Sequence, residues 1–355
     1  MFWSVHQAPG DGRGRVAGAG ALFRGNRLQM EYLRPIFLAI LCFAFSSSAV
    51  AAEWTRCLGP TGGVVHQLTV CPTDPATLLA ASLDGLLKST DAGSTWAFLS
   101  TAMGDTGRTP FVCLAYVPGE RDHLYAGSLW SGLWASKDGG ESWNLCLEWP
   151  GKESRILCLV MDPDDPQRLL VGTSGSGLFL SADGGASWRR SEGKWRHKGI
   201  SAMLPLRGEG RVCLLGVWGE GLFLGDWAMK RWDQVGAELP LGYVTVLRSA
   251  KLDDRLILGT YGRGLYQGTA GELLFSPLGS DLSSQEITDV LVDPWNPTIL
   301  YLSTDGAGVF HSSDGGQSWA SLNEGLDHRH VYCLATSPDW LYAGTCWGGI
   351  YRRPR

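Results

Sequence analysis

The sequence lacks several features that mark common classes of function. No Gly-rich phosphate loop ending in Lys and Ser or Thr occurs, which argues against a P-loop nucleotide site. The seven His are scattered and zinc-ligand spacing is absent, so we expect no metal site and no cofactor. Basic residues are outnumbered, with 30 Lys and Arg against 35 Asp and Glu, which disfavours nucleic acid as a main partner.

A long hydrophobic run is also missing. The apolar stretch at 35–45 is shorter than the ~20 residues that span a bilayer. It follows Arg34 and precedes Ala49-Val50-Ala51, the pattern of a signal peptide cleaved after Ala51. We therefore expect 1–51 to be an N-terminal extension and signal peptide, with Met30 as an alternative translation start. The mature protein is predicted to be exported, periplasmic or secreted, with no transmembrane segment after cleavage.

Glycine and tryptophan, in contrast, are abundant. The chain has 48 Gly in 355 residues, about twice the usual share, together with 16 Trp. No G-X-Y period is present, which excludes collagen. Hydrophobic residues make up 44% of the chain, enough for a globular core. This composition favours many short strands joined by turns.

An eight-residue motif, here called the box, recurs along the chain. SADGGASW at 181–188 has counterparts STDAGSTW at 89–96, SKDGGESW at 136–143 and SSDGGQSW at 312–319. The steps between Asp91, Asp138, Asp183 and Asp314 are 47, 45 and 131 residues, and the last equals three steps of about 44. Two degenerate copies, at 225–232 and 268–275, fill that gap.

The remainder of each repeat predicts four short strands separated by turns. Seven units of about 43 residues follow one another, a period found in propeller repeats. The seventh unit ends without a box, whereas Glu53–Gly59 reads like the strand that follows a box. We predict an all-β, seven-bladed β-propeller of four-stranded antiparallel blades. It forms one domain over 52–355, and the N-terminal strand closes the last blade.

The four complete boxes resemble the Asp-box (BNR) repeat, S-x-D-x-G-x-[ST]-W. The resemblance covers 52–355 and is to a superfamily that includes sialidases, xyloglucan-cleaving enzymes, sortilin-type receptors and photosystem II assembly-factor-like proteins. It implies a β-propeller whose boxes are structural turns between the third and fourth strands of a blade, and it does not imply one activity. The structural box residues are then Asp91, Trp96, Asp138, Trp143, Asp183, Trp188, Asp314 and Trp319.

A ligand site is expected on the face opposite the boxes, where loops converge on the central channel. Loops between second and third strands lie on that face, and they carry the candidate ligand-binding residues Trp130, Trp218, Glu220, Tyr261, Arg263, Asp305 and Trp347. Loops that enter the next blade add 195–198 and 328–330. Aromatic and charged side chains of this kind suit sugars or a peptide loop.

The enzyme interpretations are the weaker ones. A glycosidase needs two carboxyls roughly 5–10 Å apart, for which Asp84, Glu220 and Asp305 are candidates. The F/Y-R-I-P motif of sialidases is absent, and xyloglucan-cleaving relatives use two facing propellers. No catalytic residue is assigned. The leading hypothesis is a monomeric, non-catalytic, assembly-factor-like propeller that binds a protein or glycan partner in the cell envelope. The alternative is a glycoside hydrolase or lectin using the aromatic face.

Eight Cys lie beyond residue 51. Cys113, Cys158 and Cys333 fall at equivalent places in the first strands of three blades, which indicates packing rather than cross-linking. An exported protein permits disulfides, so a pairing of Cys57 with Cys333 or Cys346 stays open.

Overall fold

The computed structural model describes residues 52–59, 63–99, 109–148, 155–206, 212–239, 244–250, 254–279 and 282–355. The predicted signal peptide and Met30 lie outside the described residues. The described residues belong to one compact unit, Ala51–Arg355. They contain one helix, the short 3-10 helix η1 (Gly193–His197), and none long and apolar enough to cross a membrane.

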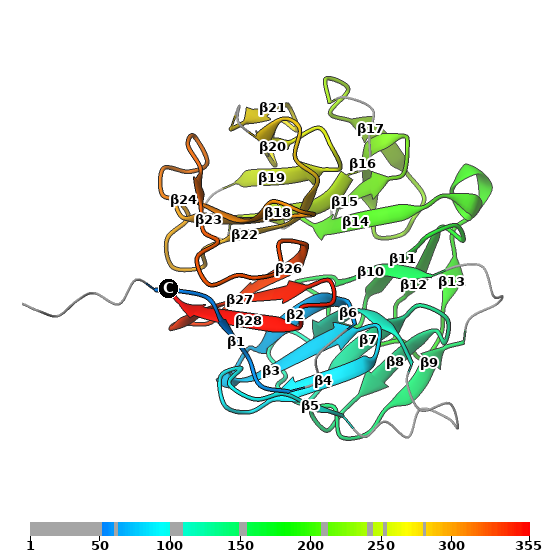
Figure 1. Ribbon diagram of the computed structural model, residues 1–355. Coiled ribbons are helices and arrows are strands. Elements are labelled where there is room, and N and C mark those ends of the chain that lie inside the picture. Colours follow the sequence, from blue (N-terminus) through cyan, green and yellow to red (C-terminus); the bar gives the residue numbers. More distant parts are fainter. Residues whose placement is uncertain are drawn as a thin grey trace, which may run out of the picture. The chain divides into compact units, whose positions relative to one another are not determined.

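The strands form seven four-stranded antiparallel sheets, which are the blades of a β-propeller (Figure 1). Blades 1 to 3 consist of β2 (Val65–Cys71), β3 (Asp74–Ser82), β4 (Gly85–Ser89) and β5 (Ala97–Phe98); β6 (Phe111–Tyr116), β7 (Leu124–Ser128), β8 (Leu133–Ser136) and β9 (Asn144–Leu147); β10 (Ile156–Met161), β11 (Leu169–Thr173), β12 (Leu178–Ser181) and β13 (Arg189–Arg190).

Blades 4 to 6 follow the same order along the chain. Their strands are β14 (Ile200–Pro205), β15 (Val212–Val217), β16 (Gly221–Asp226) and β17 (Trp232–Val235); β18 (Val244–Ser249), β19 (Arg255–Thr260), β20 (Leu265–Thr269) and β21 (Phe275–Leu278); β22 (Ile287–Val292), β23 (Leu300–Thr304), β24 (Gly308–Ser312) and β25 (Ala320–Ser321). Blade 7 contains β26 (Val331–Thr336), β27 (Trp340–Thr345) and β28 (Ile350–Pro354).

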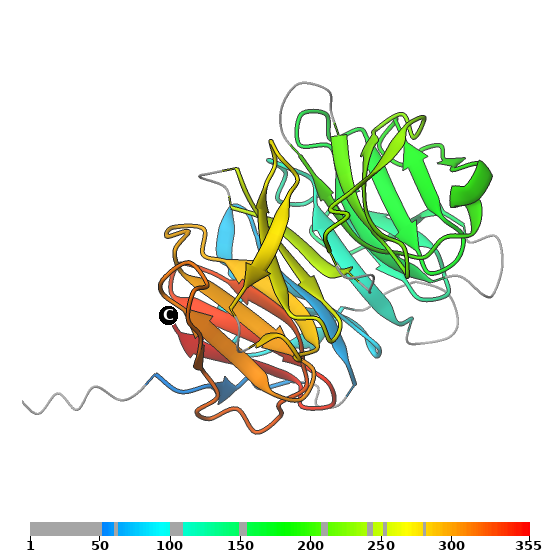
Figure 2. The ribbon, with the colours of Figure 1, turned by 90° about the horizontal axis from the view of Figure 1, so that it is seen from above.

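The N-terminal strand β1 (Thr55–Arg56) is the fourth strand of blade 7, which confirms the predicted closure of the ring. It pairs with β28, and in Figures 1 and 2 the first described residues, in blue, lie beside the C-terminal strand, in red. Trp54 anchors this junction, since its indole is buried and its Nε1 donates to the carbonyl of Leu322 at 2.6 Å. The free strand edge that blade 7 would otherwise expose is thereby covered.

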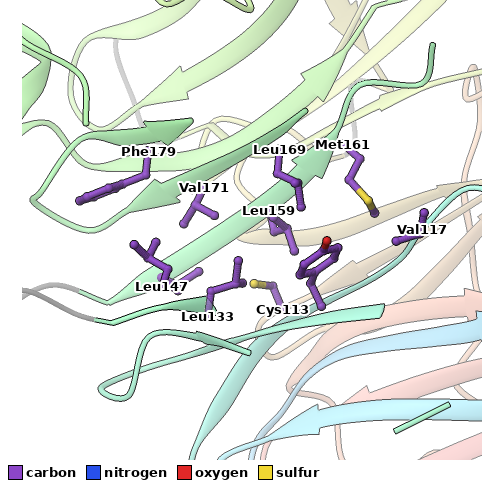
Figure 3. Close-up of a cluster of buried hydrophobic side chains, with 11 residues drawn as sticks. Cys113, Val117, Leu133, Leu147, Leu159, Met161, Leu169, Val171 and Phe179 are labelled. Carbon is purple, nitrogen blue, oxygen red and sulfur yellow. The ribbon is translucent and has the colours of Figure 1, made fainter. Parts of the chain in front are cut away.

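The hydrophobic core of the described residues is divided among the seven junctions between neighbouring blades. Figure 3 shows one such cluster, in which Cys113 and Leu133 of blade 2 face Leu159, Val171 and Phe179 of blade 3. Each blade is therefore stabilised by both of its neighbours, and burial of apolar surface depends on a complete ring.

The four boxes repeat one hydrogen-bond network. In SADGGASW, Ser181 Oγ donates to Asp183 Oδ1 at 2.8 Å and accepts the N–H of Gly185. The same carboxylate accepts the backbone N–H of Ser187 at 2.8 Å and its hydroxyl at 2.5 Å. Trp188 Nε1 donates back to the carbonyl of Gly185. The boxes that contain Asp91, Asp138 and Asp314 have the same bonds.

Each box is also tied to the preceding blade, through the residue that follows its aspartate. The residues at this position are Ala92, Gly139, Gly184 and Gly315. Their N–H groups donate to a first-to-second-strand turn of their own blade. Their carbonyls accept from the preceding blade; the donors are Tyr342 and Arg352, Lys88, Tyr125, and Arg255, respectively. One residue thus joins two blades through its backbone N–H and its carbonyl.

The cysteines of the described residues form no disulfide. All eight described Cys are free thiols, so the open pairings of Cys57 with Cys333 and with Cys346 are both absent. Cys333 is buried in the junction between blades 7 and 1, where its Sγ points at the carbonyl of Val65. Burial raises the pKa of Cys113 to about 12, as expected for a thiol packed as a small hydrophobe.

We predict that Asp183→Ala lowers the thermal midpoint at neutral pH, because Ser181 and Ser187 lose their shared acceptor. Hydrogen bonds from Ser187 and Ser181 lower the pKa of Asp183 to about 2. The carboxylate therefore contributes stability above its unfolded pKa near ~3.9, and this stability is lost as pH falls through the folded value. The difference between wild type and variant should shrink in that interval, measured by circular dichroism melts across pH. Equal midpoints at neutral pH would show that the turn does not need Asp183.

A second prediction concerns Ala92, whose φ is +55°. The same position is Gly in the other three complete boxes, with φ between 67° and 75°. A left-handed conformation is strained for Ala and free for Gly, so Ala92→Gly should raise the free energy of unfolding by about 1 kcal/mol. Urea denaturation measures the change, and Gly184→Ala is the matched control, expected to destabilise. A loss of stability in Ala92→Gly would contradict this account.

Candidate functional site

The antiparallel order of the strands creates two faces. The box turns and the first-to-second-strand turns lie at one end of the blades, here called the box face. The remaining loops lie at the other end, the loop face. All seven candidate ligand-binding residues lie in second-to-third-strand loops of the loop face: Trp130 after β7, Trp218 and Glu220 after β15, Tyr261 and Arg263 after β19, Asp305 after β23 and Trp347 after β27.

Two of these residues meet in one pocket. Trp218 and Tyr261 line a cavity of about 410 Å³ together with Ser201, Val244 and Thr245. These five residues are called the aromatic pocket below. Trp218 is 40% exposed and Tyr261 49% exposed, so both rings present a face to solvent. The pocket lies between blades 4 and 5 and opens where the loop face meets the channel.

The two aliphatic hydroxyls of the aromatic pocket, on Ser201 and Thr245, are already used as donors. Ser201 Oγ donates to the carbonyl of Val244 at 2.5 Å, and Thr245 Oγ1 donates to the carbonyl of Ile287 at 2.7 Å. Both bonds join one blade to the next. Because these protons are committed to backbone carbonyls, the pocket offers mainly aromatic and aliphatic surface to a ligand.

Gly199 positions Trp218, a contribution that the sequence analysis did not identify. A Cβ on Gly199 would lie 2.7 Å from the Trp218 ring, so only glycine lets the indole lie so close to the backbone. The backbone N–H of Trp218 also donates to the carbonyl of Gly199 at 2.9 Å. The G-I sequence before β14 gives no sign of this contact, because it is made between two loops.

The predicted acidic residues are paired rather than free. Glu220 forms a short ion pair with Lys198, which belongs to the loop entering blade 4. The carboxylate of Asp305 lies 2.5 Å from Nδ1 of His330 in the loop entering blade 7. Lys198 and His330 were both noted in the sequence as loop-face residues, but their carboxylate partners could not be known without the fold.

A further carboxylate joins the site through Tyr261. A hydrogen bond to Glu286 raises the pKa of the Tyr261 hydroxyl, and the charge of Asp305 adds to the effect. Burial raises the pKa of Tyr332 to about 12, again with a contribution from Asp305. These groups continue from the pocket toward the channel mouth. Glu286 was missed in the sequence, where only its place before a predicted strand could have drawn notice.

The other three candidates, Trp130, Arg263 and Trp347, do not line the aromatic pocket. Trp347 is 63% exposed and has a φ of +66°, a conformation rare for a bulky side chain. The equivalent positions in blades 4, 5 and 6 are Gly219, Gly262 and Gly306, all at positive φ. The fold thus holds Trp347 in a turn position whose backbone conformation favours glycine.

The central channel is lined by the second and third residues of all seven first strands, around a cavity of about 230 Å³. All seven strands carry an irregularity between their first and third residues, which turns the second side chain into the channel. These second residues are His66, Val112, Leu157, Ser201, Thr245, Thr288 and Tyr332. In the described part of the chain, no group of His, Cys, Asp and Glu is arranged to hold a metal ion.

No protein-family profile and no curated protein sequence matches the chain. Solved structures do. A GH74 xyloglucanase from Xanthomonas campestris superposes with a TM-score of 0.65 at 19% identity, covering 85% of this chain and 53% of that one. YCF48 from Cyanidioschyzon merolae gives 0.65 at 16% identity, with 86% and 99% covered.

The extracellular domain of the putative hybrid two-component system BT3049 from B. thetaiotaomicron gives a TM-score of 0.67 at 15% identity, covering 85% of this chain and 42% of that one. All three are similar in fold. The chain is a β-propeller. It spans about half of the xyloglucanase chain and nearly all of YCF48.

The channel also yields a prediction for His66. Its Nε2 is buried without a partner among the described residues, and burial lowers its pKa to about 4. The neutral imidazole is therefore favoured by folding, and stability should fall as pH drops from the unfolded value of about 6.5 toward 4, by up to ~3 kcal/mol. His66→Phe, which preserves the edge-on contact with Tyr332, should remove this dependence. The exposed His197→Phe is the control, and urea denaturation between those pH values is the measurement. If the free energy of unfolding changed with pH to the same extent in wild type and His66→Phe, this prediction would be refuted.

Proposed function

We propose that this chain is an exported, non-catalytic Asp-box propeller that binds a protein partner in the cell envelope, in the manner of an assembly factor. The observation that carries the proposal is the aromatic pocket. It places two half-exposed aromatic rings around a cavity of about 410 Å³ on the loop face. A cavity of this kind suits one or two apolar side chains of a partner.

The chemistry of the pocket favours a protein over a glycan. Sugar hydroxyls need polar groups that donate and accept, and the Ser201 and Thr245 protons are already donated to backbone carbonyls. The remaining walls are Trp218, Val244 and Tyr261. Tyrosine and tryptophan are the residues most enriched where protein partners dock, because they bury large areas and keep a polar tip.

The arrangement of the three carboxylates selected from the sequence argues against the hydrolase alternative. Glu220 and Asp305 are each bound to a basic side chain, Lys198 and His330. Together with Asp84 they come from blades 4, 6 and 1, of which no two are adjacent. A glycosidase instead needs two carboxyls that face one glycosidic bond.

The similar structures include both enzymes and a protein solved with a peptide partner. GH74 enzymes share the fold, and so does YCF48, which has been solved bound to a D1 peptide. Extracellular domains of bacterial sensor proteins share it too. Export is supported by the signal-peptide pattern that ends at Ala51.

The proposal predicts that Trp218→Ala and Tyr261→Ala abolish stoichiometric capture of one envelope protein by the immobilised protein. Each removes a wall of the aromatic pocket, and an anchor residue of this kind costs more than about 2 kcal/mol when truncated. Trp130→Ala is the matched control, because Trp130 is an exposed Trp on the same face outside the pocket. Quantitative mass spectrometry of the bound fraction reads the result.

A screen for hydrolysis of β-glucans and sialosides tests the alternative with the same preparations. We expect no turnover. Hydrolysis that is lost in Glu220→Gln or Asp305→Asn would contradict the binding proposal and assign an enzymatic function instead.

A further inference from the structure

The segment that leads into the aromatic pocket carries a group of cations without carboxylate partners among the described residues. The segment Arg189–Lys198 contains five Lys and Arg and one acid, Glu192, in a chain whose formal net charge is −5. Of these cations only Lys198 is in an ion pair with a described residue. Three of the others, Arg190, Lys194 and Arg196, are called the basic ledge. Arg189 instead donates to the carbonyl of Ala228, in the box-face turn between β16 and β17.

Neutral groups fix the positions of two ledge cations. Arg190 donates to the carbonyls of Ser176 at 2.9 Å and Arg196 at 2.7 Å. Lys194 lies over the rings of Trp195 and Phe223, 5.1 and 5.7 Å from their centroids. These contacts order the side chains of Arg190 and Lys194, and neither cation forms an ion pair with a carboxylate in the described part of the chain.

The cations are also held close to one another. Burial lowers the pKa of Arg190, and the like charge of Arg196 lowers it further. The short helix η1 brings Lys194 and Arg196 back toward β13, since Arg190 bonds to the backbone of that helix. Repulsion of this kind is relieved when an anion binds, so the ledge is complementary to a negatively charged partner.

The ledge and the aromatic pocket are continuous. Lys198 and Gly199 connect them, because Lys198 pairs with Glu220 and Gly199 lies against the Trp218 ring. Arg190 holds Ser176, in the loop next to the Ser174 carbonyl that also lies beside Gly199. A single extended ligand can therefore contact both.

We propose that the loop face binds a peptide segment rich in Asp or Glu, with its carboxylates on the basic ledge and a neighbouring apolar side chain in the aromatic pocket. This rests on the proposed binding function of the pocket. Guanidinium groups match carboxylates in geometry, and the apolar pocket with its committed hydroxyls selects a peptide over an anionic polysaccharide.

The test uses the full chain and a fluorescein-labelled peptide with a Glu-Glu pair on each side of a Phe-Leu pair. A matched peptide carries Gln in place of Glu, and another carries Ala-Ala in place of Phe-Leu. Fluorescence anisotropy should show saturable binding of the Glu peptide that weakens when salt rises from about 0.05 to about 0.5 M. The Gln peptide should bind more weakly and lose most of this salt dependence.

Lys194→Gln combined with Arg196→Gln removes two exposed cations that donate no side-chain hydrogen bond to a described residue. We expect the Kd for the Glu peptide to rise roughly 2- to 30-fold, with a flatter salt dependence. Arg121→Gln combined with Lys137→Gln removes two exposed cations from the box face and should leave the Kd unchanged. Thermal melts confirm that each variant is folded.

The outcomes separate this inference from the proposed function. If the Glu peptide does not bind, or if the Lys194/Arg196 variant binds it with unchanged Kd and salt dependence, the inference is overturned. Trp218→Ala tests the aromatic pocket, since it should weaken binding of the Phe-Leu peptide and leave binding of the Ala-Ala peptide unchanged. If binding of the Phe-Leu peptide were unchanged, the proposed role of the pocket would be refuted while the result for the basic ledge would stand. Tighter binding of polygalacturonate or phosphatidylglycerol vesicles through the same two cations would refute the peptide as partner.

Discussion

The residue that follows each box aspartate makes the backbone contacts on which the ring depends most. Its N–H bonds to a turn of its own blade, and its carbonyl accepts a side chain from the blade before. The aspartate network holds that residue in place by fixing the turn around it. Since the core is divided among the blade junctions, a contact that sets how one blade meets the next also sets the packing of the junction. The boxes therefore have a structural role, and the proposed binding site lies on the opposite face.

On that face, the site arises from contacts between loops of different blades. Trp218 is carried by blade 4, Tyr261 by blade 5, and Glu286 and His330 by the loops entering blades 6 and 7. No blade contains the site by itself. Its geometry depends on the same blade-to-blade register that the boxes maintain, which links the repeated box turns to the geometry of the aromatic pocket.

The fold was predictable because its signal is periodic. Four complete boxes, two degenerate copies and the N-terminal strand at Thr55–Arg56 were sufficient to predict the number of blades and the closure of the ring. The loop face and the exposed Trp218 and Tyr261 followed from the order of strands. What could not be predicted were contacts across blades: the carbonyl of Gly184 reached by Tyr125, and the Trp218 ring against Gly199. Such pairs are distant or unpatterned in sequence, and only the relative placement of blades brings them together.

Site-specific photocrosslinking in cells that export the protein tests the central claim most directly. A photoreactive phenylalanine analogue would replace Trp218 or Tyr261 on the loop face, and Trp295, an exposed residue of a first-to-second-strand turn, on the box face. The account predicts one discrete adduct with a protein from positions 218 and 261 and none from position 295. An adduct from position 295 alone would contradict it and move the binding surface to the face of the boxes.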